Sequence, residues 1–534
     1  MSTKDEAREL AGRGRWRELT IVAQSAVIGV AVGVVVSGFR GVLETIEGAV
    51  QSVFTTIRGN VAYVPAWLGV VVVLGLAVGW LSRRWPMIAG SGIPQVVAVI
   101  KGYMSDNWMT TLIAKFVGGA LAMLGGLSLG REGPCIQMGA AVADGLGQRL
   151  SRSPTRRIVL IAGGASAGMS AAFGAPLAGV IFVFEEIFRY LSPLTLVATT
   201  TAAVLADYVT LFLLGDDPVL DIPSAPSLPL TSYWVLLVLG LLLGALGALY
   251  NVLLLGIQTH YNAVMEGRGL RGSATPSERR SRWGALVKPL PILGLAVIVG
   301  LTFPTALGGG GVALEALMDN PGLTFLAVLL VVKFVFSIVS FSAGVPGGIL
   351  FPLLTIGAIA GAAVGTLAID GLGLDPATYN GFIVVAMAGC FAAIVRAPVT
   401  GIMLLTEMTG SFEHFLALTL VSLVAYLTAE ALGSKPIYVS LLATLLRRER
   451  GRIGETGQRV LVETIVHLGA PGCGTAVRDL DLPPETLIIS VDRDDMSFIP
   501  DGGTEVVAHD RLTLVTDRAH AGQLNDRLEE LFSN

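Results

Sequence analysis

Long apolar runs alternate with short segments rich in glycine, proline and charged residues along most of the chain. Several runs approach the roughly 20 residues that a helix needs to cross a bilayer, and others are shorter, which predicts incomplete helices. Lipid offers the backbone no hydrogen-bond partner, so a span is a helix or part of a closed barrel, and the residue alternation of a barrel is absent. We therefore expect an all-α polytopic membrane protein whose spans include Leu19–Val36, Leu68–Leu81, Leu194–Leu214, Val235–Leu255, Leu290–Phe303, Phe325–Phe341 and Phe415–Leu432.

The composition and the distribution of charge agree with this prediction. Of the 534 residues, 14% are charged, whereas an ordinary soluble domain carries roughly 25%. Basic residues gather beside the apolar runs, and the positive-inside rule places those loops and both termini in the cytoplasm of a multi-pass inner (plasma) membrane protein. These residues are Arg13, Arg15, Arg17, Arg83, Arg84, Arg149, Arg152, Arg156, Arg157, Arg279, Arg280, Arg282, Arg447, Arg448 and Arg450.

The residues that usually carry chemistry give no sign of an enzyme or a metal site. Cys135, Cys390 and Cys473 are scattered, and the five histidines lack the spacing of metal ligands. The sequence shows no nucleophile–base pair, so we do not expect an intramembrane enzyme. We expect no cofactor and no nucleic-acid polymer as a partner.

The membrane part contains an internal repeat. Lys115-Phe116-Val117 recurs 218 residues later, and Gly130, Pro134 and Gly139-Ala140 recur at the same offset. APLAGVIFVFE (175–185) returns as APVTGIMLLTE (397–407). Related halves of this kind often lie antiparallel, with broken helices that meet near the midplane. The expected parts are a cytoplasmic N-terminal helix (1–18), a first half (19–215), a Pro-rich linker (216–231), a second half (232–448), a short linker (449–458) and a cytoplasmic domain (459–534).

The last part of the chain has a different character. Residues 459–534 are rich in Asp and Val and contain the strand-like runs Thr486–Asp492 and Arg511–Asp517. The stretch His520–Phe532 has the pattern of an amphipathic helix. This segment is too polar to cross a membrane, so it predicts a small α+β domain.

Four glycine-containing breaks interrupt the apolar segments: GSGIPQ (90–95), GREGP (130–134), GVPGGILFP (344–352) and GSKPIY (433–438). Such a break frees N–H groups that need a partner in hydrocarbon. A helix that begins after the break points its first N–H groups and its positive dipole end at one spot, which favours an anion. Taken singly, each break is more often a simple kink, but several converging helix starts would bind a dehydrated anion without a tight basic pocket.

Together these motifs resemble the CLC family of chloride channels and chloride/proton antiporters over about residues 19–448. The resemblance implies a homodimer in which each subunit has its own anion pathway between two inverted halves. It implies that Ser91 and Tyr438 donate to a central anion and that the backbone N–H groups of Ile349 and Leu350 complete the site. The family usually has Phe at the position of Leu350. The anion-binding residues implied are Ser91, Gly92, Ile93, Arg131, Gly133, Ile349, Leu350 and Tyr438.

Two acidic residues resemble the family's proton-transfer groups. Glu132 resembles the external gating glutamate, a carboxylate that can occupy an anion position and leave it when protonated. Glu186 matches the internal glutamate of the antiporters, and channels of the family generally lack an acid there. The resemblance therefore implies chloride/proton exchange, with an uncoupled gated anion channel as the alternative. The serine of GSGIP favours chloride, because nitrate-preferring relatives tend to have proline there, and fluoride exporters depart from the motifs more widely.

Other charged residues in the apolar runs favour structural roles. The Arg131 side chain is expected to pair with an acid near the surface. Lys115 and Lys333 occupy equivalent positions of the repeat, which favours buried pairing or carbonyl capping over transport. Glu185 and Glu407 are also equivalent, which favours roles at helix ends or at an interface. Glu132 in isolation could simply pair with an arginine.

The C-terminal segment Leu468–Val515 is similar to the TrkA-C (RCK-C) domain of potassium-transport regulators, through PGCG, RDLDLP, IPDGGT and HDRL. His509 stands where that family usually has Gly. The similarity implies pairing of the domains and a small regulatory ligand, such as a cyclic dinucleotide. The alternative is that the domain only strengthens the dimer. A further hypothesis is a membrane sensor or scaffold, which would not need Glu132 and Ser91 together.

Overall fold

The computed structural model describes residues 3–151, 153–188, 192–215, 219–220, 222, 226–266, 278–450, 459–493, 496–517 and 520–532. Arg152, part of the expected Pro-rich linker and most of the linker 449–458 lie outside these residues, as do the side chains of Arg13, Arg15, Arg17, Arg279, Arg280, Arg282, Arg448 and Arg450. The chain forms two compact units. One contains residues 1–96 and 107–441, and the other contains residues 97–106 and 442–534.

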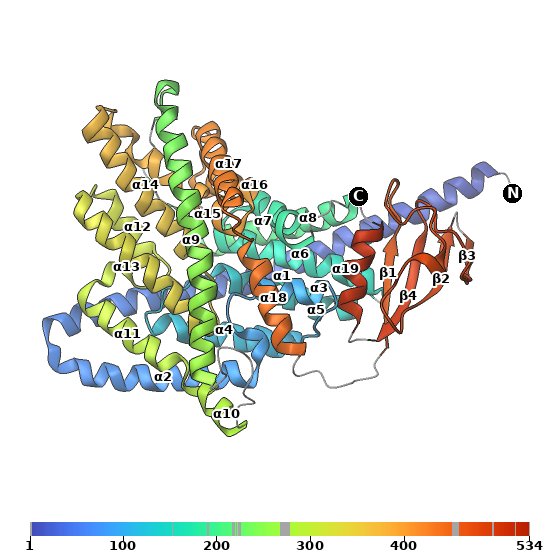
Figure 1. Cartoon of the computed structure of the whole chain (residues 1–534), viewed down its shortest axis with the longest axis horizontal. Helices are drawn as coiled ribbons and strands as arrows, with labels where there is room; N and C mark the ends of the chain where they lie inside the picture. Colours follow the sequence, from blue (N-terminus) through green and yellow to red (C-terminus); the bar gives the residue numbers. More distant parts are fainter. Residues whose placement is uncertain are drawn as a thin grey trace. The chain divides into compact units, whose positions relative to one another are not determined.

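The first half of the helical unit follows the apolar runs of the sequence (Figure 1). Proline opens several of its helices at the first or second position, where its missing N–H costs no hydrogen bond. In chain order the helices are α1 (Thr3–Gly59), α2 (Val64–Arg84), α3 (Ile93–Ile100), α4 (Trp108–Leu124), α5 (Glu132–Leu150), α6 (Pro154–Phe173), α7 (Pro176–Phe182) and α8 (Pro193–Leu214).

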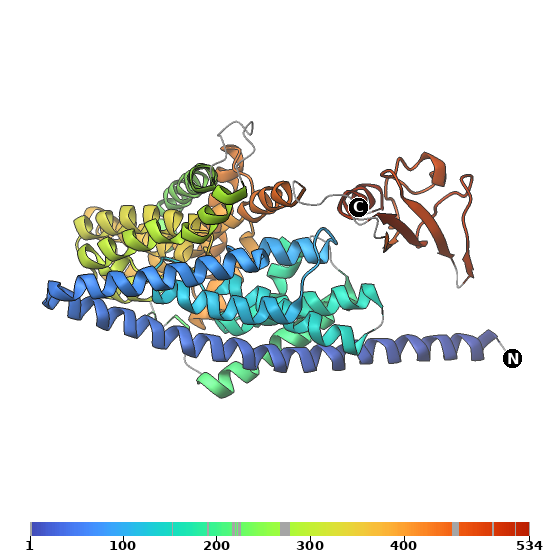
Figure 2. The ribbon, with the colours of Figure 1, turned by 90° about the horizontal axis from the view of Figure 1, so that it is seen from below.

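Helix α1 shows no break at residue 18, where the expected N-terminal helix was to end. From Leu19 to Gly59 this helix has 41 residues and measures about 60 Å at 1.5 Å per residue. This is about twice the thickness of a bilayer core, and the second part of the segment carries the charged residues Arg40, Glu44 and Glu47. It packs along α6 and α8 (Figure 2).

The second half repeats the element order of the first. Helices α13 to α17 follow one another as α4 to α8 do, and the repeated lysines lie in α4 and α13. The helices are α9 (Tyr233–Glu266), α10 (Glu278–Val287), α11 (Pro289–Thr302), α12 (Gly311–Met318), α13 (Leu323–Ser342), α14 (Leu350–Leu372), α15 (Tyr379–Val395), α16 (Pro398–Thr409), α17 (Phe415–Ala431) and α18 (Ile437–Arg450).

The repeated Gly-Ala pairs lie where two helices of one half approach each other closely. A Cβ on Gly139 would lie 2.2 Å from the carbonyl oxygen of Gly164, and one on Gly357 would lie 2.6 Å from that of Ala386. In lipid, small residues allow such backbone contact, and van der Waals packing then stabilises the pair. The glycines therefore explain why α5 packs on α6 and α14 packs on α15.

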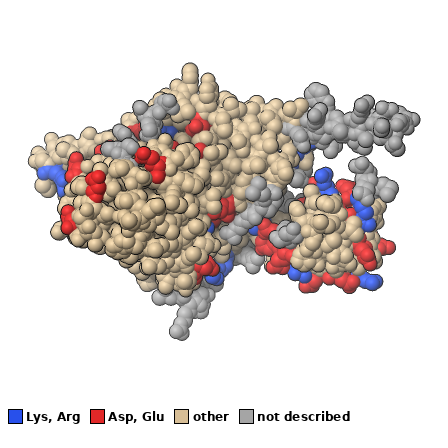
Figure 3. Space-filling view, turned by 90° about the horizontal axis from the view of Figure 1, so that it is seen from above, with Lys and Arg blue, Asp and Glu red and all other residues tan. Residues whose placement is uncertain are grey.

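The helical unit has the surface of a multi-pass membrane protein. Among the described residues, 8 helices are long and apolar enough to cross a membrane. Charged residues are sparse over the face of this unit in Figure 3, whereas both signs of charge cover the tail domain. Intervening short helices, such as α3 and α7, confirm the expectation of incomplete spans.

The tail is the small α+β domain that the sequence predicts. Its antiparallel sheet has the order β1-β4-β2-β3, and its helix follows the last strand. Buried apolar residues from alternate strand positions and from the helix form its core, including Val491, Leu512 and Leu528. The elements are β1 (Arg459–Ile465), β2 (Leu487–Arg493), β3 (Met496–Phe498), β4 (Arg511–Asp517) and α19 (Ala521–Phe532).

Candidate functional site

The break before α3 forms a tight loop that ends in Ser91. Gly90 and Gly92 on either side have φ angles of +71° and +103°, which residues with a side chain rarely adopt. Ser91 is 2% exposed. Because α3 begins at Ile93, its first turn and its positive dipole end lie directly after this serine.

The breaks before α5 and α14 meet, although they lie in different halves. The backbone groups of Gly130 and Gly348 exchange two hydrogen bonds of 2.7 Å. The preceding loops are joined as well, by hydrogen bonds from Gly90 N to Val345 O (3.0 Å) and from Gly347 N to Gly90 O (3.1 Å). The starts of α3, α5 and α14 are therefore held together by short backbone bridges.

Glu132 lies at the start of α5 and is fully buried. One of its carboxylate oxygens accepts a hydrogen bond from the backbone N–H of Phe351, at 3.4 Å, in the first turn of α14. The other oxygen has no hydrogen-bond partner among the described residues. The carboxylate thus occupies a place where a helix N-terminus favours an anion.

Ile349 and Leu350 open α14, and both are buried. Their N–H groups belong to the first helical turn, which has no partner within the helix. Phe351, the neighbour of Leu350 that donates to Glu132, is not among the site residues predicted from the sequence. The signal was available, because Phe351 lies in the same first turn of α14.

Tyr438 follows the last of the four breaks, at the start of α18. It is 2% exposed, and its ring meets the ring of Phe182 edge-on at 6.5 Å. Phe182 is the last residue of α7, which continues into the turn that carries Glu186. Among the described residues, neither the Tyr438 phenol nor the Ser91 hydroxyl has a hydrogen-bond partner. Two buried hydroxyl donors are therefore available, and Ser91 lies against Gly133, the neighbour of Glu132, where an added Cβ would lie 2.5 Å from Ser91 Oγ.

Glu186 lies in a π-helical turn, Val183–Phe188, that continues α7. It is 5% exposed. The wider turn of a π-helix changes the direction of its side chains, and such turns occur often at functional sites. The sequence predicts Glu186 as a site residue but does not predict the π-helical turn in which it lies.

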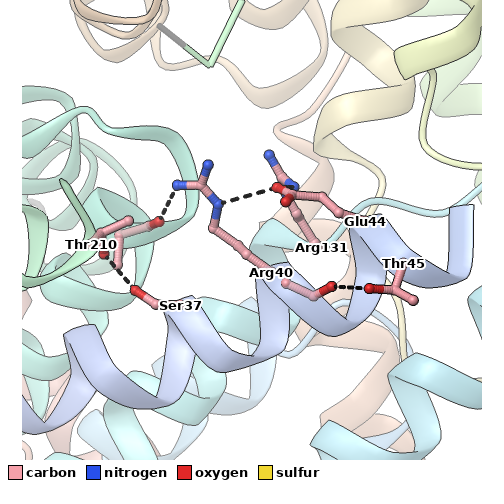
Figure 4. A network of polar contacts seen from close by, with 8 residues as sticks. Ser37, Arg40, Glu44, Thr45, Arg131 and Thr210 are labelled. Carbon is pink, nitrogen blue, oxygen red and sulfur yellow. Dashed lines mark hydrogen bonds and ion pairs between the residues drawn. The ribbon is translucent and has the colours of Figure 1, made fainter. Parts of the chain in front are cut away.

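The Arg131 side chain makes the surface pair that the sequence predicts (Figure 4). Its Nη1 lies 3.3 Å from Glu44 Oε1 of α1, and the same carboxylate lies 3.9 Å from Arg40 Nε. Arg40 also donates to the carbonyl oxygen of Ala171 at 3.0 Å. The negative charge of Glu44 thus compensates the positive charges of both arginines, in a network that joins α1 to the start of α5.

The two repeated lysines cap carbonyl groups, as expected. Lys115 donates to the carbonyl oxygens of Ile88 and Gly90, and Lys333 donates to those of Ala306, Leu307 and Gly308. Each lysine thereby satisfies a loop that precedes a short helix of its own half. Both side chains are fully buried.

Glu185 and Glu407 each cap the start of a helix that belongs to the other half. Glu407 of α16 accepts hydrogen bonds from Leu177 N and Ala178 N at the start of α7, at 2.9 and 2.7 Å. Glu185 accepts hydrogen bonds from Val399 N and Thr400 N at the start of α16, at 3.2 and 2.8 Å. This confirms the prediction of helix-end roles, and it explains why both acids recur.

Several polar residues that were not predicted from the sequence hold the site from inside apolar helices. Asn251 of α9 donates to Ile394 O, Ser434 Oγ and Lys435 O, which supports the loop that leads to Tyr438. Gln95 and Gln137 donate to the loop that carries Ser91. A buried polar residue in an apolar helix was the only available signal.

The fold and this arrangement of helix starts agree with comparisons to known proteins. Residues 74–430 match the Voltage gated chloride channel family, and residues 461–529 match the TrkA-C domain. The chain belongs to the CLC family of voltage-gated chloride channels and carries a C-terminal TrkA-C domain.

Its relatives include exchangers from bacteria. It is 33% identical over 463 residues to the H(+)/Cl(-) exchange transporter ClcA of Vibrio parahaemolyticus, which covers 84% of this chain and 94% of that protein. It is 32% identical over 465 residues to ClcA of Klebsiella pneumoniae, which covers 85% of this chain and 95% of that protein. Among solved structures, a slow cyanobacterial Cl-/H+ antiporter superposes with a TM-score of 0.70 at 27% identity, covering 81% of this chain and 99% of that one.

Proposed function

We propose that the protein is a secondary active transporter that exchanges chloride for protons across the membrane. The names of the two ClcA relatives support this activity. The observation that carries the proposal is the position of Glu132, whose carboxylate lies against the first turn of α14 as an anion would. A group that is both an anion and a proton acceptor can link the movement of the two ions.

In this proposal Glu132 is the gate. Deprotonated, its carboxylate occupies the anion position and blocks the path, and protonation removes the charge that holds it there. Chloride then enters, with Ser91 and Tyr438 as donors and the first turns of α3, α5 and α14 as the dipole ends around it. A site of helix ends and hydroxyl groups, without a formal positive charge, releases the ion readily.

Glu186 carries the proton on the inner side. Its burial supports this assignment, as does its position in the turn that continues α7, whose last residue, Phe182, packs edge-on against Tyr438. The alternative is an uncoupled, gated chloride channel of the same fold, which would not need an acid at this position. We also propose that both termini lie in the cytoplasm and that two chains form a homodimer.

Reconstitution in chloride-loaded liposomes tests the proposal. A chloride gradient is expected to drive proton uptake by the natural protein. Glu186→Ala is expected to abolish proton movement while chloride still flows, and Glu132→Ala is expected to uncouple the two fluxes. Glu413→Ala, at an exposed glutamate of the same unit, is the matched control and should behave as the natural protein. Chloride flux without any proton signal in the natural protein would leave only the channel.

We also propose that the tail regulates transport in response to a small ligand, such as a cyclic dinucleotide. Support comes from the segment 97–106, which belongs to the same compact unit as the tail. In that unit Lys101 Nζ lies 2.9 Å from Glu529 Oε2, and the Asn525 amide donates to the carbonyl oxygen of Lys101. Helix α3, which starts next to Ser91, therefore ends in the unit of the tail.

The alternative is that the tail only strengthens the dimer. Deletion of residues 459–534 and the charge reversal Glu529→Lys separate the two roles. If the tail regulates, the reversal changes the chloride flux while the dimer stays intact in light scattering. Unchanged flux together with weakened dimers would reject regulation.

A further inference from the structure

The loop that carries Ser91 has four consecutive carbonyl groups, and each accepts a hydrogen bond from a buried side chain. Gln137 donates to Met87 O at 2.8 Å, and Gln95 donates to Ala89 O at 2.6 Å. Lys115 donates to Ile88 O and Gly90 O at 2.9 and 2.8 Å. The donors come from three helices, α3, α4 and α5.

This arrangement has an electrostatic consequence. A carbonyl oxygen is the negative end of a dipole, so a free carbonyl near an anion would repel it, and a buried free carbonyl is costly in itself. Three side chains instead hold all four oxygens in hydrogen bonds. Among the described residues the Ser91 hydroxyl has no hydrogen-bond partner, so it is the polar group of this loop that can donate to an anion.

Gln137 occupies a particular position in this set. It lies on α5, five residues after Glu132, and it is 2% exposed. Its amide oxygen has no hydrogen-bond partner among the described residues and faces Gly92, where an added Cβ would lie 2.6 Å from it. One rigid helix therefore carries the gating carboxylate at its start and, further along, a donor to the loop of Ser91.

From this geometry we infer that Gln137 and Gln95 are positioning residues that hold the Ser91 loop in its anion-binding conformation. Gln137 also connects that loop to the helix of Glu132. The inference rests on the proposed function, because it assumes that chloride binds at Ser91. Neither glutamine needs to touch the anion, since each acts through the loop carbonyls.

Methionine substitutions test this inference. Gln137→Met and Gln95→Met keep the length of the side chain and remove the donor, which leaves one loop carbonyl without a partner. For each variant we expect the dissociation constant for chloride, measured by calorimetry on the purified full chain, to rise about tenfold. We also expect fewer protons to be moved per chloride in liposomes. Gln148→Met is the control, because Gln148 lies on the same helix but is exposed and bonds Asp144.

A purely structural role would lower the temperature of unfolding and leave the chloride affinity and the proton-to-chloride ratio unchanged. That result in both variants would overturn the inference. If Gln137→Met does not fold, Gln95→Met decides the question. The hydrogen bond from Gln95 to Ala89 O joins residues six positions apart, so its loss does not separate two helices. If the natural protein itself binds no chloride, the proposed function fails instead, so the two failures are distinguishable.

Discussion

Replacing Glu407 or Glu185 with glutamine should destabilise the contact between the two halves of the membrane unit. Each carboxylate accepts two backbone N–H groups at the start of a helix in the other half. Glu185 also accepts a hydrogen bond from the Thr400 hydroxyl at 2.7 Å. Glutamine keeps one oxygen acceptor but turns an NH2 group toward the second N–H, so one hydrogen bond and the negative charge are lost.

The magnitude follows from these contacts. A hydrogen bond to a charged group contributes about 1.5–3 kcal/mol, and the charge at a helix N-terminus contributes about 0.3–1 kcal/mol more. We therefore expect a loss of about 2–4 kcal/mol in the free energy of unfolding for either variant. The double variant should lose less than the sum, because both caps hold the same pair of helices, α7 and α16.

Thermal unfolding of the purified protein in detergent measures this loss, with Glu413→Gln as the exposed control. Glu185 directly precedes Glu186 in the π-helical turn, so Glu185→Gln should also slow proton flux more than Glu407→Gln does. Equal unfolding temperatures for Glu407→Gln, Glu185→Gln and the control would refute the capping argument. Additive losses in the double variant would refute the shared contact.

Three further predictions follow from buried charges. Lys333→Met should lower the free energy of unfolding by about 2–4 kcal/mol, because it leaves three loop carbonyls without their donor. Lys115→Met should act similarly, and thermal unfolding in detergent measures both. In the tail, Arg493→Ala should lower the free energy of unfolding by about 3–5 kcal/mol, as thermal unfolding would measure. The reason is that the buried carboxylate of Asp510 loses a bidentate partner, whose Nε and Nη2 donate to its two oxygens at 2.7 and 2.8 Å. Burial alone would raise the pKa of Asp510, but its hydrogen bonds from Arg493 and the backbone N–H of Val507 outweigh burial and hold that pKa below its ordinary value. The unfolded chain therefore binds this proton more readily, so the stabilisation is complete above about pH 4 and is lost as the pH falls through the lower folded pKa. A tail whose stability rises on acidification over that range would contradict this.

Much of the architecture was predictable from local patterns. The run Leu194–Leu214 became α8, because an apolar stretch near span length opens with a proline that suits a first helical turn. The strands around Thr486–Asp492 and Arg511–Asp517 formed as expected, since alternation and β-branched residues act within a few positions. The repeat identified equivalent residues, such as Lys115 and Lys333, before any coordinates.

The partners of polar residues were not predictable in this way. Arg131 was expected to pair near the surface, but Glu44 as its partner depends on how α1 packs on α5. The acid Glu186 was recognised, yet its π-helical turn leaves no mark in the sequence pattern. Gln95 and Gln137 were missed, because a lone amide in an apolar helix does not indicate which carbonyl it binds.

The sequence by itself determined the class of protein, the two halves, the four helix breaks and the residue types that can handle an anion and a proton. Only the tertiary structure decided which of these groups meet. The bonds between Glu132 and Phe351 and between Glu407 and Ala178 join residues more than 200 positions apart. Such contacts arise when helices of the two halves pack, and the energy of a buried polar group depends on the partner that packing supplies.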